Sequence, residues 1–74
     1  MNNEFMKNIN YDLIKLLHCK LDSAWRLEKY YINDANEAKC HSLPSLEKIL
    51  EEDKKHIEIL REEIKMRMDA GVFD

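Results

Sequence analysis

With 74 residues and a net charge of −3, the chain has room for one domain (residues 1–74) and lacks the basic surface that nucleic-acid binding requires. One glycine and one proline are typical of a helical chain, and no stretch approaches the ~18 apolar residues of a membrane span. The N-terminus lacks the basic start and apolar run of a signal peptide, so we expect a cytoplasmic protein whose two cysteines, Cys19 and Cys40, are free thiols.

The first predicted element is a long helix over about residues 11–38. Asn10 is a candidate N-cap, because its side chain can accept a hydrogen bond from the first free backbone N–H groups. Steps of alternately three and four residues then give an almost continuous apolar stripe, which indicates an amphipathic helix. The stripe consists of Ile14, Leu17, Leu21, Ala24, Glu28, Tyr31 and Ala35.

A second helix is predicted over about residues 43–69. Ser42 is a candidate N-cap, Pro44 falls in the first turn, where a missing N–H is tolerated, and Gly71 follows the far end. The four-residue connection 39–42 makes the two helices antiparallel neighbours. The apolar stripe of this helix consists of Leu46, Ile49, Asp53, His56, Leu60 and Ile64.

The predicted fold class is therefore all-α, an antiparallel two-helix hairpin. Two helices alone leave half of each stripe in water, and a chain this short is marginally stable by itself. We expect the hairpin to form a homo-oligomer, in which a second copy completes a four-helix bundle.

Three polar residues interrupt the stripes, namely Glu28 in the first helix and Asp53 and His56 in the second. If the connection is centred near residue 41, residue 28 faces residue 54, so all three lie at one level of the bundle. A twofold dimer would then bring four carboxylates and two imidazoles together, which is the ligand set of a two-metal carboxylate site. The imidazole nitrogens favour iron, manganese or zinc over calcium or magnesium.

At these residues the chain resembles the ferritin-like superfamily, specifically its short half-bundle members of the encapsulated-ferritin and rubrerythrin-like type. The resemblance rests on Glu28, on the run Asp53-Lys54-Lys55-His56 and on Tyr31 just beyond Glu28. It implies a di-iron site assembled across a dimer interface, with ferroxidase activity where both metal positions fill. The family has Glu-x-x-His where this chain has Asp53, whose side chain is one methylene shorter.

The alternative is a non-catalytic helical hairpin used for oligomerisation or for docking on a partner protein. In that case Glu28, Asp53 and His56 form a buried polar layer, with the imidazolium hydrogen-bonded between two carboxylates. Buried polar residues of this kind fix the register and orientation of coiled-coil partners. The residues themselves leave both hypotheses open.

Overall fold

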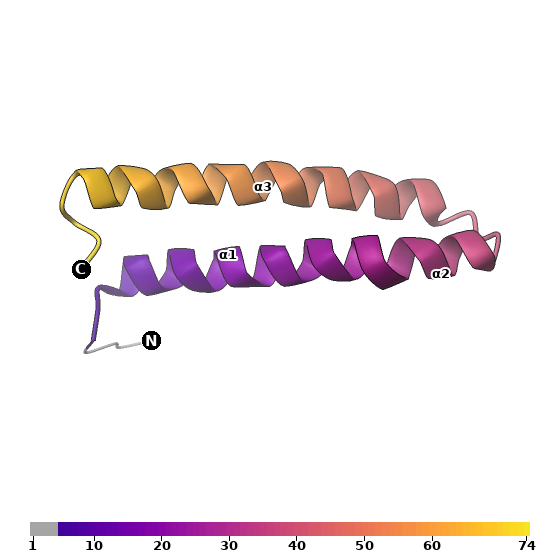
Figure 1. The fold of residues 1–74 in the computed structure, drawn as a ribbon, viewed down its shortest axis with the longest axis horizontal. Coiled ribbons are helices and arrows are strands. Elements are labelled where there is room, and N and C mark those ends of the chain that lie inside the picture. The colour runs from indigo at the N-terminus through magenta and orange to yellow at the C-terminus, as the bar shows by residue number, and fades with distance from the viewer. Residues whose placement is uncertain (1–4) are drawn as a thin grey trace.

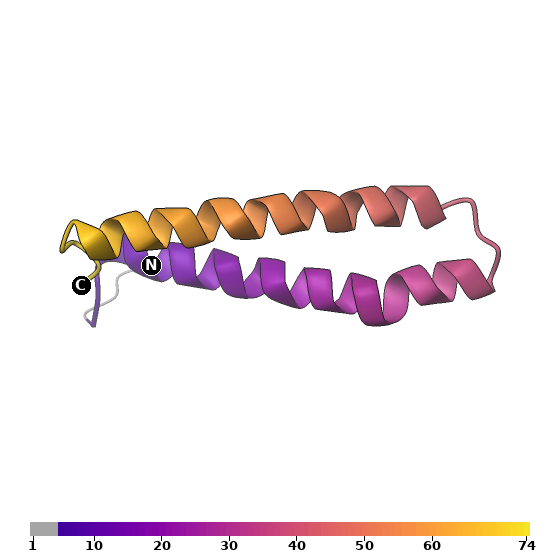
Figure 2. The same ribbon diagram turned by 45° about the horizontal axis from the view of Figure 1, so that its top comes forward.

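The computed structural model describes residues 5–74, which form two long helical arms and, in that range, no strand. The first arm consists of α1 (Asn8–Arg26), a π-helical segment η1 (Leu27–Tyr31) and α2 (Ile32–Glu37), which follow one another without a break. The second arm is α3 (Leu43–Asp69), which runs antiparallel to the first (Figure 1). A second view shows the same two-arm arrangement (Figure 2), and the prediction of an all-helical chain is confirmed.

The starts of the helices differ from the expected caps. The first arm begins at Asn8, with Lys7 before it and no side-chain cap, so the prediction that Asn10 is the N-cap is wrong. Ser42 does precede α3 and Pro44 does lie in its first turn, but the Ser42 hydroxyl caps no backbone N–H. It donates instead to the thiol sulfur of Cys40, at 3.1 Å.

Both arms end in the same hydrogen-bonded turn, in which one residue has a left-handed backbone. At the end of α2 this residue is Lys39 (φ 52°), and the N–H of Cys40 donates to the carbonyl of Ala35 at 2.9 Å. At the end of α3 it is Gly71 (φ 73°), and the N–H of Val72 donates to the carbonyl of Arg67 at 2.9 Å. This is the Schellman motif, which favours glycine because a side chain strains the left-handed position.

The two left-handed positions give a matched stability prediction. Lys39→Gly should raise the free energy of unfolding by about 1 kcal/mol, because it removes the strain of a β-carbon in the left-handed region. Gly71→Ala should lower it by about the same amount, although an added β-carbon meets no atom within 4 Å. Urea denaturation of both variants measures the changes, and equal signs for the two would contradict this explanation.

The arms meet along a seam in which inward-facing residues recur at intervals of three and four. On α3 the buried and half-buried seam residues are Leu43, Leu46, Leu50, Asp53, Ile57, Leu60, Ile64 and Arg67. On the first arm they are Asn10, Leu13, Leu17, Lys20, Ala24, Leu27, Ile32 and Ala35. This pattern is that of an antiparallel coiled coil.

The π-helical segment explains the one irregular step in the seam. The step from Leu27 to the next seam residue, Ile32, is five positions, whereas steps of four and three in a regular helix would place Tyr31 and then Asp34 against α3. The extra residue of the π-turn rotates the end of the arm, so that Ile32 and Ala35 face α3 instead. The turn thus exchanges a carboxylate at the seam for apolar side chains.

The observed seam differs from the predicted stripes at several positions. On the first arm Leu13, Lys20 and Leu27 lie in the seam, and each of the predicted residues beside them is exposed: Ile14, Leu21 and Glu28. On α3 the seam contains Leu50 and Ile57 rather than Ile49 and His56. The apolar surface of each helix is wider than one seam requires. Two neighbouring sets of residues, each spaced at three and four, therefore fit the sequence equally well.

At the open end of the hairpin, Asn10 joins the two arms. Its side chain is fully buried, and its amide nitrogen donates to the carbonyl oxygens of Val72 (2.9 Å) and Asp74 (3.0 Å). Its side-chain oxygen accepts a hydrogen bond from the guanidinium of Arg67. Lys7 adds a backbone bond and an ion pair to Asp74, each of 2.8 Å. Polar contacts therefore join the two arms at this end.

The hairpin is too thin to bury much of its apolar surface. In the described range only four apolar residues are buried, Leu27, Ala35, Leu50 and Leu60, whereas twelve large apolar side chains are exposed. The radius of gyration is 15.9 Å, compared with about 11 Å for a compact domain of this length. A single hairpin thus presents much of its core-forming surface to water.

Candidate functional site

The most distinctive polar feature of the seam is the carboxylate of Asp53. The residue is only 4% exposed. One carboxylate oxygen accepts a hydrogen bond from the Ser23 hydroxyl at 2.6 Å, and the other lies 3.4 Å from the Lys20 ammonium. Because a buried carboxylate is costly unless it is paired, Lys20 and Ser23 are what make Asp53 tolerable in the seam. The cation that neutralises Asp53 in this chain is thus a lysine.

The structure places Glu28 and His56 elsewhere, and both are exposed. Glu28 and Glu47 help to line a shallow surface hollow of about 400 Å³ near the closed end of the hairpin. Glu47 and His56 are nine residues apart on α3, and this spacing puts them on opposite sides of the helix and about 13 Å apart along its axis. One hairpin therefore brings Glu28 together with Glu47 and separates it from His56.

No group of three or more potential His, Cys, Asp or Glu metal ligands is present among residues 5–74. Asp53 and His56 lie one helical turn apart on α3, but the carboxylate of Asp53 is hydrogen-bonded to Ser23 of the first arm. Tyr31, which the resemblance places near the site, is exposed. A metal site made of Glu28, Asp53 and His56 would need residues from two copies, and it stays a prediction.

The polar layer in the structure has different members from the one expected. Lys20 and Ser23 were missed because the predicted stripe ran through Leu21 and Ala24. One signal in the sequence could have found Lys20. Lys20 lies seven residues after Leu13 and seven before Leu27, so the three residues occupy the same position of successive heptads. A buried carboxylate on α3 also requires a cation on the facing helix.

Two surfaces flank the seam, one on either side, and we name each after a leucine of the first arm. The Leu16 face contains the rows Ile9, Leu16, Ser23 and Tyr31 on the first arm and Ile49, His56 and Glu63 on α3. The Leu21 face contains the rows Ile14, Leu21 and Glu28 on the first arm and Glu47, Lys54, Arg61 and Met68 on α3. Glu28 and Glu47 line the same hollow, which confirms that the two rows of the Leu21 face lie on the same side of the seam.

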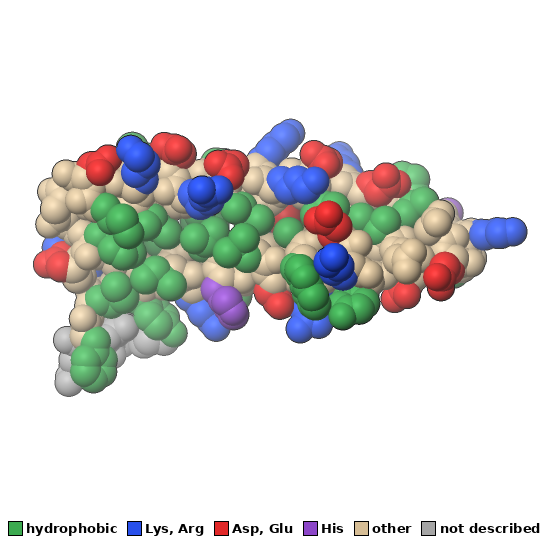
Figure 3. Space-filling model, in the orientation of Figure 1, with side chains coloured by type: hydrophobic (Ala, Val, Ile, Leu, Met, Phe, Trp, Pro, Cys, Tyr) green, Lys and Arg blue, Asp and Glu red, His purple; other side chains and the backbone are tan. Residues whose placement is uncertain are grey.

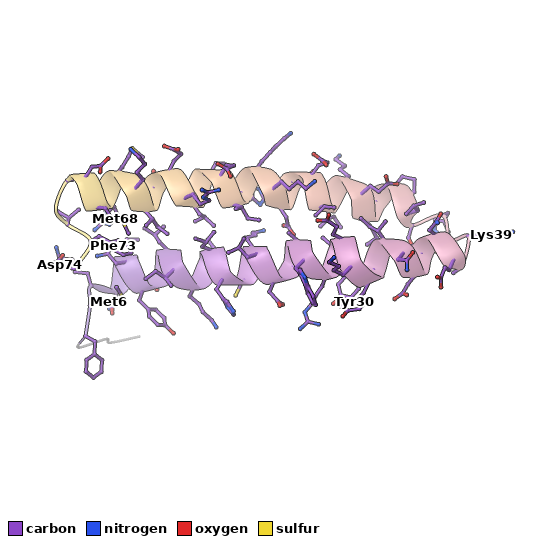
Figure 4. All side chains as sticks on the ribbon, in the orientation of Figure 1. Met6, Tyr30, Lys39, Met68, Phe73 and Asp74 are labelled. Atoms are coloured by element: carbon purple, nitrogen blue, oxygen red, sulfur yellow. The ribbon has the colours of Figure 1, made fainter. Side chains whose placement is uncertain are left out.

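The two faces differ in charge. The rows of the Leu16 face include one carboxylate, Glu63, and one imidazole, His56, whereas the rows of the Leu21 face include four charged side chains. Figure 3 looks onto the Leu21 face, where hydrophobic side chains follow the seam and charged side chains follow α3. Trp25 and Tyr30 form an edge-to-face pair beside it, with ring centroids 5.3 Å apart. Tyr30 points away from α3 (Figure 4).

Both cysteines are exposed, and one of them has an altered acidity. The hydrogen bond from the Ser42 hydroxyl stabilises the thiolate and lowers the pKa of Cys40 below its usual value. In a Cys19→Ser background, Cys40 should react with a disulfide reagent at a lower pH than an ordinary thiol does, because more of it is thiolate. Ser42→Ala should shift that pH–rate profile upward, and an unchanged profile would contradict the assignment.

None of the described helices is long and apolar enough to span a membrane. No protein-family model, curated protein or solved structure matches the chain. The evidence on function is thus the geometry of the hairpin itself.

Proposed function

We propose that this chain is a non-catalytic association unit, in which the Leu16 faces of two copies pack together to complete a four-helix bundle. The observation that carries the proposal is the charge-poor, apolar Leu16 face that a single hairpin leaves open. Leu16, Tyr31 and Ile49 on this face are each close to half exposed. Depletion of charge and enrichment in aromatic residues are typical of the central part of a protein interface.

The amount of exposed surface supports the same proposal. The chain has 5731 Å² of accessible surface, whereas a compact monomer of its mass has about 4,800 Å². The accessible surface of the chain is thus about 900 Å² larger than that of a compact monomer. Each partner in a standard interface buries a similar area, about 800 Å². Docking of a second copy would thus bring the surface of each chain to the value of a compact domain.

The Asp53 layer has a role in this proposal. Since Lys20 and Ser23 satisfy Asp53 only when the arms pair in the observed register, the layer disfavours a slipped hairpin. A correct register keeps Leu16 and Ile49 on one face, which the bundle requires. The polar layer therefore contributes specificity at some cost in stability.

The proposal is tested by Leu16→Glu, with the neighbouring Lys15→Glu as control, since residue 15 is exposed and about 200° from the seam residue Leu17. Burial of one leucine contributes about 1.5–3 kcal/mol, and a twofold dimer loses two of them, so Leu16→Glu should raise the dissociation constant of the bundle by about a hundredfold or more. Lys15→Glu should leave it nearly unchanged. Sedimentation equilibrium measures both, and similar effects of the two variants would contradict the proposal.

The competing hypothesis is the ferritin-like metal site of Glu28, Asp53 and His56. Any ion that binds the native assembly raises its melting temperature by mass action. Our proposal predicts no rise on addition of Fe²⁺, Mn²⁺ or Zn²⁺ under anaerobic conditions. A rise that disappears in both Asp53→Asn and His56→Ala, with assembly retained, would favour the metal site instead.

A further inference from the structure

We propose that the Leu21 face is a second association surface, on which another copy of the chain docks antiparallel and joins bundles into a larger assembly. This goes beyond the bundle formed by the Leu16 face and rests on separate residues. The Leu21 face lies on the opposite side of the seam, so both surfaces can be occupied at once. Leu21 (49% exposed) is as open as Leu16 (48%).

The first observation is a stripe of six charged residues along the Leu21 side of α3. They follow one another at alternating intervals of four and three residues, which keeps them on one side of a helix. In order they are Glu47, Glu51, Lys54, Glu58, Arg61 and Lys65. Two neighbouring pairs within the stripe are ion pairs, Glu51–Lys54 at 3.5 Å and Glu58–Arg61 at 3.1 Å.

This stripe is complementary to itself when it is reversed. In an antiparallel pair of α3 helices centred on His56, the midpoint of Leu43–Asp69, Glu47 meets Lys65, Glu51 meets Arg61 and Lys54 meets Glu58. The twofold axis repeats each pair, so all six positions face an opposite charge. Opposite charges in such rows select antiparallel alignment and register between helices.

The second observation concerns what lies beside the stripe on the first arm. The bonds Ser23–Asp53 and Asn10–Arg67 fix the level of one arm against the other, and they place Leu21 level with residue 56. The same twofold axis therefore brings Leu21 of one copy against Leu21 of the next. Trp25, half exposed, comes level with Leu17 of the second copy. An apolar centre is thus flanked by a charged row, as in an interface core with its polar rim.

The other twofold arrangement fits less well. A second copy turned about an axis parallel to the helices would place its first arm over α3. Glu28 would then face Glu47 of the second copy, since these two residues already lie at one level of a single hairpin. Leu21 would face the charged row instead of another leucine. The charge pattern therefore favours the arrangement in which α3 packs on α3.

The test compares two leucine variants that are matched in residue type, arm and exposure. Sedimentation velocity of the full chain should show an assembly larger than a dimer. Leu21→Glu should reduce it to the dimer held by the Leu16 face, and Leu16→Glu should leave only contacts through the Leu21 face. If Leu21→Glu leaves the size of the assembly unchanged, the second surface is wrong, although the bundle stands. If only Leu16→Glu is without effect, the bundle is wrong and the second surface stands.

A charge exchange tests the arrangement without altering the apolar centre. Glu51→Lys and Arg61→Glu should each weaken the larger assembly by about tenfold, because each places like charges opposite one another twice. The double variant should restore the wild-type affinity, since the opposite charges face each other again. Circular dichroism confirms that each variant keeps its helices. A double variant that associates no better than the single ones would overturn the antiparallel arrangement.

Discussion

Replacement of Lys20 by methionine is expected to lower the free energy of unfolding by about 3 kcal/mol. The substitution keeps most of the aliphatic volume but removes the ammonium that lies 3.4 Å from the Asp53 carboxylate. Asp53 would stay buried, with the Ser23 hydroxyl as its remaining side-chain partner. Removal of one partner of a buried ion pair costs about 3–5 kcal/mol, and Lys20, at 29% side-chain exposure, belongs at the lower end.

A second variant separates the loss of the pair from the loss of packing. Lys20→Met combined with Asp53→Leu replaces the polar layer by apolar residues, and it should be at least as stable as the wild type. Chemical denaturation at one fixed protein concentration gives both values, since the stability of an assembling chain depends on concentration. A double variant as unstable as Lys20→Met alone would show that packing, rather than the unpaired carboxylate, causes the loss.

Asn10→Ala is expected to cost about 3 kcal/mol and to open the free end of the hairpin. The side chain is fully buried, and its three hydrogen bonds join α1 to Arg67 and to the segment after α3. Without it, the Nε group of Arg67 loses its acceptor, and the carbonyl of Val72 keeps only the longer bond of 3.4 Å from Arg67 Nη2. Each unsatisfied buried group costs about 1–3 kcal/mol, so the total exceeds that of a typical surface change.

Hydrogen exchange locates the effect of this variant. In Asn10→Ala the amide of Val72 should lose protection, whereas that of Cys40, at the other end of the molecule, should keep it. Asn36→Ala is a suitable control, because Asn36 is exposed near the closed end. Equal destabilisation by the two asparagine variants would contradict the role given to Asn10.

The helical arms could be predicted because their composition and periodicity leave few alternatives. The single proline falls in the first turn of α3 and the single glycine at its end, and both positions suit the residue. The π-turn at Leu27–Tyr31 could not be predicted, since no residue type marks it. It follows from the competition between Tyr31 and Ile32 for the place against α3, which only the packed arms decide.

The candidate site was predicted in part. Asp53 was identified as a carboxylate facing the seam, and it is buried there. Its partners were not identified, because Lys20 and Leu21 are adjacent and the apolar surface on either side is wide enough for both registers. Glu28 and His56 are each adjacent to the residue that does face inward, Leu27 and Ile57 respectively. The predicted stripes passed through Glu28 and His56 instead, and both are exposed in the single hairpin.

The most direct test of the central claim is the mass of the unmodified chain in solution, measured by sedimentation over a wide range of concentration. If the hairpin exists to associate with itself, the mass should be a multiple of 8.9 kDa, and it should fall in Leu16→Glu but not in Lys15→Glu. A folded chain that sediments at 8.9 kDa at every concentration would contradict the account.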